Sequence, residues 1–79
     1  MIVTTTDNVP GQKIAKILGV VHDSRTAWAS GKKAQDLIMK ELVKQAEALG
    51  ADAIIGLKLE LASFGGYIGT GTAVKLEKT

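Results

Sequence analysis

The residues best suited to chemistry lie together at one point of the sequence, where His22 is followed by Asp23 and Ser24. His22 is the single histidine, and the chain has no cysteine, so no thiolate metal cage can form. In an extended strand the Asp23 side chain points to the face opposite His22, because successive side chains alternate. We therefore predict no metal site and keep His22 only as a candidate ligand, including one shared across a ring with one imidazole per subunit.

Catalytic constellations are also missing from the sequence. No serine lies in a nucleophile elbow, and His22 has no identifiable acid partner for nucleophilic catalysis. The carboxylates show no spacing that pairs two of them for general acid and base work; they include Asp7, Asp52, Glu60 and Glu77. We predict that the protein is not an enzyme and that it carries no identifiable cofactor.

Size and composition indicate one small globular domain over residues 1–79, with 46% apolar and 23% charged residues. A domain this short usually needs a disulfide, a metal or a partner chain for stability. Since the sequence offers neither of the first two, we predict that the protein associates with itself as a homo-oligomer.

The charge and hydropathy of the chain argue against nucleic-acid and membrane partners. The net charge is +2, and the ten basic residues are scattered rather than gathered into a stripe. Nucleic-acid binding usually rests on a clustered basic face, so this partner is disfavoured, although a weak RNA-binding domain remains an alternative. The chain begins without a basic segment followed by a long apolar core, and no apolar run approaches the ~20 residues of a membrane span. We expect a cytoplasmic protein with no membrane partner.

The sequence pattern predicts the order strand, strand, helix, strand, strand. β-Branched residues favour strands at 2–6 and 12–22, separated by a turn at Pro10 and Gly11. Apolar spacing predicts a helix from residue 32 to 49, ended by Gly50, with one apolar stripe of Ala34, Leu37, Ile38, Leu42, Ala46 and Leu49. Period-two patterns predict strands over 54–61 and 67–76, the first with a single apolar face of Ile55, Leu57, Leu59 and Leu61. The polar residues 23–31 are expected to form a connection. The fold class is therefore α+β.

Small residues in the strands suggest a covered sheet surface. We expect the single helix to cover one face of the sheet and the opposite face to hold Ala15, Gly19, Gly56, Gly69, Gly71 and Ala73, with Ile17, Val21 and Ile54. Glycine inside a strand often marks close approach of another backbone, which would here belong to a neighbouring subunit. The alternative is a twisted sheet with glycines at β-bulges.

Several segments in order resemble the YbjQ family of small uncharacterised proteins, which are described as heavy-metal-binding. These are residues 2–5 (IVTT), 9–14 (VPGQKI), 18–21 (LGVV), 49–56 (LGADAIIG) and 67–75 (YIGTGTAVK). The resemblance implies a two-layer β-α-β-β subunit like that of dodecin, with an antiparallel sheet and a short extra N-terminal strand, assembled into a ring that is typically pentameric. It implies no established reaction, and a bound metal ion only through the family description. The sequence is shorter than the family pattern between Asp23 and Leu37.

The leading hypothesis is a non-enzymatic, self-assembling module of YbjQ type. Its predicted oligomer interface comprises Ile2, Val3, Thr4, Gly69, Gly71 and Trp28. The N-terminal strand is included because exposed β-branched residues at a free edge invite pairing, and Trp28 because aromatic residues are enriched in interfaces. A metal- or small-ligand-binding ring is the first alternative.

Overall fold

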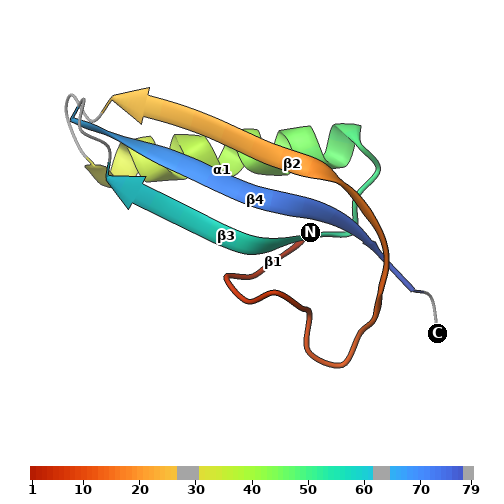
Figure 1. Ribbon diagram of the computed structural model, residues 1–79. Coiled ribbons are helices and arrows are strands. Elements are labelled where there is room, and N and C mark those ends of the chain that lie inside the picture. Colours follow the sequence, from red (N-terminus) through yellow and green to blue (C-terminus); the bar gives the residue numbers. More distant parts are fainter. Residues whose placement is uncertain (27–30, 62–64, 78–79) are drawn as a thin grey trace.

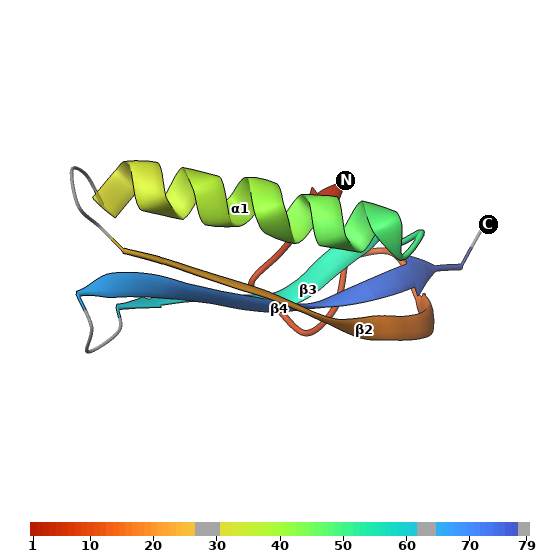
Figure 2. The same cartoon turned by 90° about the horizontal axis from the view of Figure 1, so that it is seen from above.

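A helix lying on one face of a four-stranded sheet forms the protein (Figures 1 and 2). The computed structural model describes residues 1–26, 31–61 and 65–77. The elements are β1 (Ile2–Val3), β2 (Ile14–Thr26), α1 (Gly31–Ala48), β3 (Ala53–Leu61) and β4 (Gly66–Leu76). The sheet order is β1-β3-β4-β2, in which β4 is antiparallel to both β2 and β3. The expected α+β fold is confirmed, but β1 pairs parallel to β3, so the sheet is mixed.

The helix is held by an apolar stripe at four-residue spacing. Ala34, Ile38, Leu42 and Ala46 are all buried. The last three pack on residues of β2, β3 and β4, including Val21 and Ile54. Residues at this spacing share one face of a helix. Leu37 and Leu49, which the apolar spacing also placed in the stripe, are instead 38% and 45% exposed.

The end of α1 is fixed by Gly50, as predicted. Gly50 has a φ of 77°, its N–H donates to the Glu47 carbonyl at 2.9 Å, and the Ala51 N–H donates to the Ala46 carbonyl at 3.0 Å. These two hydrogen bonds form a Schellman motif, which satisfies carbonyls left open at the helix end. The motif turns the chain directly into β3.

A second apolar cluster lies on the sheet face away from α1, which we call the far face. Val9 packs there on Ala53, Ile55, Val74 and Leu76, with no helix residue among them. The predicted turn at Pro10 and Gly11 positions Val9: Gly11 has a φ of 78°, and the Gln12 N–H donates to the Val9 carbonyl at 3.0 Å. The N-terminal loop therefore covers part of the far face.

The predicted single apolar face of β3 is wrong because the strand contains a bulge. The pairing of β3 with β4 breaks between Ile55 and Lys58, where Gly56 has a φ of 60°. A bulge adds one residue and reverses the side-chain alternation beyond it. Ile54 therefore lies in the core under α1, Ile55 lies on the far face, and Leu57 and Leu59 return to the helix side.

Strand β2 differs from its prediction in both length and side-chain alternation. It continues four residues past His22, because residues 23–26 pair with residues 66–69 of β4. Cross-strand pairing thus overrides the polar composition of this segment. An irregularity between Ile17 and Gly19 also separates Leu18, which packs against the core under α1, from Val20, which is 70% exposed.

The predicted small-residue face opposite the helix is also wrong: Val21, Ile54 and Ala73 lie in the core under α1, and the two central glycines face the same core. A Cβ atom built on Gly69 would collide with Ile38 of α1, and one on Gly71 would lie 2.6 Å from Cγ2 of Ile54. Both glycines are buried within the subunit. Their missing side chains make room for the chain's own core rather than for a neighbouring subunit.

Candidate functional site

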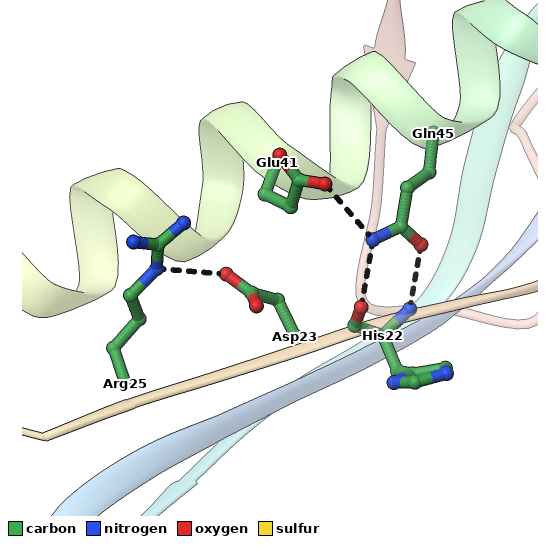
Figure 3. A network of polar contacts seen from close by, with 5 residues as sticks. All are labelled: His22, Asp23, Arg25, Glu41 and Gln45. Atoms are coloured by element: carbon green, nitrogen blue, oxygen red, sulfur yellow. Dashed lines mark hydrogen bonds and ion pairs between the residues drawn. The ribbon is translucent and has the colours of Figure 1, made fainter.

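His22 and Asp23 lie on opposite faces of β2, as the alternation predicted (Figure 3). The imidazole of His22 points away from α1, and His22 is opposite Thr70 in the β2–β4 register. The carboxylate of Asp23 lies on the helix side, where its Oδ2 accepts a hydrogen bond from Nε of Arg25 at 3.0 Å. The two side chains therefore cannot act on the same ion or substrate atom.

The donor set of one chain does not fit a heavy-metal site. Among the described residues, no three His, Cys, Asp or Glu side chains lie close enough together to hold an ion. His22 has a threonine as its cross-strand neighbour, and the nearest carboxylate in sequence is on the other face in an ion pair. Heavy metals prefer imidazole and thiolate ligands in clusters. We therefore derive no chemistry through a metal in the isolated subunit.

The backbone of His22 is bound by a side chain of the helix. Oε1 of Gln45 accepts from the His22 N–H at 3.1 Å, and Nε2 of Gln45 donates to the His22 carbonyl at 2.8 Å (Figure 3). Nε2 also lies 3.4 Å from Oε1 of Glu41, one turn earlier in α1. Sequence reasoning missed Gln45, since a glutamine on a helix looks like any solvated residue.

Three large apolar side chains on the far face are exposed, Ile17, Val20 and Ile68, and we call them the far-face patch. They are 66%, 70% and 41% exposed. Their cross-strand neighbours are Val74, Thr72 and Ser24 respectively, and residues opposite each other in antiparallel strands share a face. The N-terminal loop covers the cluster around Val9 but leaves this patch open.

The residues predicted as an oligomer interface are not brought together. Ile2 and Val3 pair with Ala53 and Ile54 of β3, and Thr4 continues this pairing through hydrogen bonds to Ile54 and Leu57. The N-terminal strand is thus occupied by its own chain, with Ile2 still 40% exposed. Gly69 faces Ile38 of α1 and Gly71 faces Ile54 of β3, so both point into the subunit's own core, which corrects their assignment to the interface. Trp28 lies outside the described residues.

Comparison with known families identifies the chain. Residues 28–77 match the model of the YbjQ family, whose description reads "Putative heavy-metal-binding". The chain belongs to the YbjQ family. The resemblance that the sequence motifs indicated is therefore confirmed.

Similar proteins from several bacteria carry the name UPF0145. This YbjQ chain is 34% identical to one from Thermotoga maritima, with 99% of each chain covered, and 34% identical to one from Vibrio parahaemolyticus, with 96% and 98% covered. The Thermotoga alignment runs over 105 positions, whereas the chain has 79 residues, so the relative carries additional residues.

A solved structure confirms the fold of this YbjQ chain. It is a protein of unknown function of the DUF74 family from Pediococcus pentosaceus, with a TM-score of 0.71, 23% identity and 98% of each chain covered. In the described residues, no helix is long and apolar enough to cross a membrane.

Proposed function

We propose that the protein is a non-enzymatic module that assembles with copies of itself into a ring. The observation that carries this proposal is the far-face patch, which exposes three large apolar side chains on a chain of 79 residues. Burying a Val, Leu or Ile side chain contributes about 1.5–3 kcal/mol, so covering Ile17 and Val20 would stabilise a small domain substantially.

The position of the exposed apolar residues favours a ring over a two-fold dimer. Ile17 and Val20 belong to β2 at one edge of the sheet, whereas Met1 and Ile2, which are 49% and 40% exposed, lie at the edge formed by β1. A contact between two different surfaces repeats from subunit to subunit and closes into a ring when the rotation allows it. We infer that the β1 edge of one subunit meets the far-face patch of the next. A ring of five and a cytoplasmic location stay predictions.

Light scattering coupled to size exclusion tests this proposal. The parent chain is expected to elute as a multimer, and Val20→Glu or Ile2→Glu is expected to shift the mass toward that of the 8.3 kDa chain. Leu61→Glu is the matched control, because Leu61 is 73% exposed and projects to the helix side of the sheet. A monomeric parent, or equal masses for all three variants, would contradict the proposal.

A further inference from the structure

The outer edge of β2 is the longest strand edge that the fold leaves without a partner strand. β2 has 13 residues and lies at the end of the sheet order, with β4 on its inner side. In the described part of the chain no other strand pairs with it. A long exposed edge of this kind is a template for uncontrolled pairing with other chains.

We propose that Gln45 closes this edge, so that the protein assembles through a defined surface instead of adding strands along β2. Its carboxamide donates one hydrogen bond to the His22 carbonyl and accepts one from the His22 N–H, at 2.8 and 3.1 Å. A residue of an adjacent antiparallel strand makes the same pair of hydrogen bonds with its opposite residue. Gln45 therefore takes the place of one residue of an incoming strand.

The position of His22 in β2 determines how much of the outer edge is left for an incoming strand. Backbone groups of alternate residues point to the same side of a strand, so Val20, His22 and Ser24 share the outward direction. An incoming strand that pairs along β2 must use these outward groups in succession. With His22 occupied, an incoming strand can pair only with residues 23–26 or with residues 14–21, and the second stretch is interrupted by irregularities between Ile14 and Lys16 and between Ile17 and Gly19.

The helix holds Gln45 ready for this role. Leu42 and Ala46 on either side of Gln45 are fully buried against the sheet, which fixes α1 over β2. Glu41 lies 3.4 Å from the Gln45 amide nitrogen, close to its second N–H. Core packing therefore places the Gln45 amide beside His22. Its two hydrogen bonds to His22 then require little further loss of side-chain conformational entropy.

This inference goes beyond the proposed function and does not depend on where the subunits meet. The test compares Gln45→Met, which keeps the side-chain length and removes both hydrogen bonds, with Lys44→Met, which adds the same side chain at the adjacent, exposed position. Sedimentation velocity at increasing concentration should show larger, heterogeneous species for Gln45→Met and the parent distribution for Lys44→Met. Parent-like sedimentation of both variants, or the same large species in both, would overturn the inference.

Amide hydrogen exchange gives a second, local measurement. The His22 N–H should exchange about fivefold faster in Gln45→Met than in the parent, because one hydrogen bond contributes on the order of 1 kcal/mol. The Val21 N–H should be unchanged, since Val21 is paired with Gly71 on the inner side of β2. Unchanged protection of His22 would overturn the inference.

A rescue and a measurement on the parent chain separate edge closure from a folding defect. Adding Ser24→Pro to Gln45→Met should restore the parent distribution, because proline removes a neighbouring outward donor and is tolerated at sheet edges. Large species that persist in the double variant would contradict edge pairing.

In the parent itself, the side-chain amide of Gln45 should exchange more slowly than those of Gln12 and Gln35, and equal exchange would also overturn the inference.

Discussion

Gly69 of β4 lies directly beneath Ile38 of α1, with no space for a side chain between them. A Cβ atom at this position would also lie 3.0 Å from Cδ2 of Leu59. Gly69→Val should therefore lower the free energy of unfolding by about 1–3 kcal/mol through overpacking. Urea denaturation followed by circular dichroism measures the change.

Two further variants test whether contact with α1 causes the expected loss of stability in Gly69→Val. Thr70→Val is the control, since Thr70 is the next residue of β4 and points to the far face; its stability should stay close to that of the parent. Ile38→Ala combined with Gly69→Ala should lose less than the sum of the two single changes, because Ile38→Ala removes the Cγ2 atom that the new Cβ would meet. Full additivity would contradict direct contact between Gly69 and Ile38.

Gly56 should be sensitive to backbone conformation rather than to space. Its φ is 60°, and a Cβ atom would meet only Oδ1 of Asp7, at 3.9 Å. Gly56→Asn should cost less than about 1 kcal/mol, whereas Gly56→Val should cost clearly more, since β-branched residues avoid positive φ. Chemical denaturation of both variants checks the order. Equal losses would mean that the bulge does not require this conformation.

Lys75 should stabilise the junction between α1 and β3. Its Nζ donates to the Gly50 carbonyl at 3.0 Å, just beyond the helix end, and lies 3.7 Å from Oδ1 of Asp52. Because both side chains are nearly half exposed, Lys75→Met should cost only about 0.3–1 kcal/mol, and less at high salt. The measurement is urea denaturation at low and at 1 M salt.

Lys16 provides the matched control for Lys75, because the two lysines are opposite each other in the β2–β4 register. Like charges at opposite positions repel, so Lys16→Met should leave the stability unchanged or raise it slightly. A loss equal to that of Lys75→Met would show that removal of any lysine here is destabilising, which contradicts a specific role for Lys75.

Removal of metal should leave the fold unchanged. The chain has no cysteine, and its single imidazole has no clustered carboxylates among the described residues. Treatment with EDTA should keep Tm within error, and His22→Ala should give the same result. A fall of several degrees that one ion reverses would instead support a metal-binding ring, the alternative that the family description favours.

Local patterns in the sequence determined the order of the elements and the end of α1. The stop at Gly50, the turn at Pro10 and Gly11, and the four-residue spacing of Ile38, Leu42 and Ala46 depend on neighbouring residues only, and each is found where the sequence predicts it. The motifs of residues 50–56 and 67–75 were also sufficient to indicate the family.

The tertiary structure alone decided which face each strand residue occupies. One bulge at Gly56 and the irregularity before Gly19 reverse the alternation, so Ile54 became core and Val20 became surface. Packing of the helix on the sheet placed Gly69 and Gly71 in the core. The pairing of Gln45 with His22, 23 residues apart, likewise arises only when α1 is placed on β2. A one-residue shift in register changes the energy of local interactions very little. The register is therefore fixed by packing between segments that are distant in the sequence.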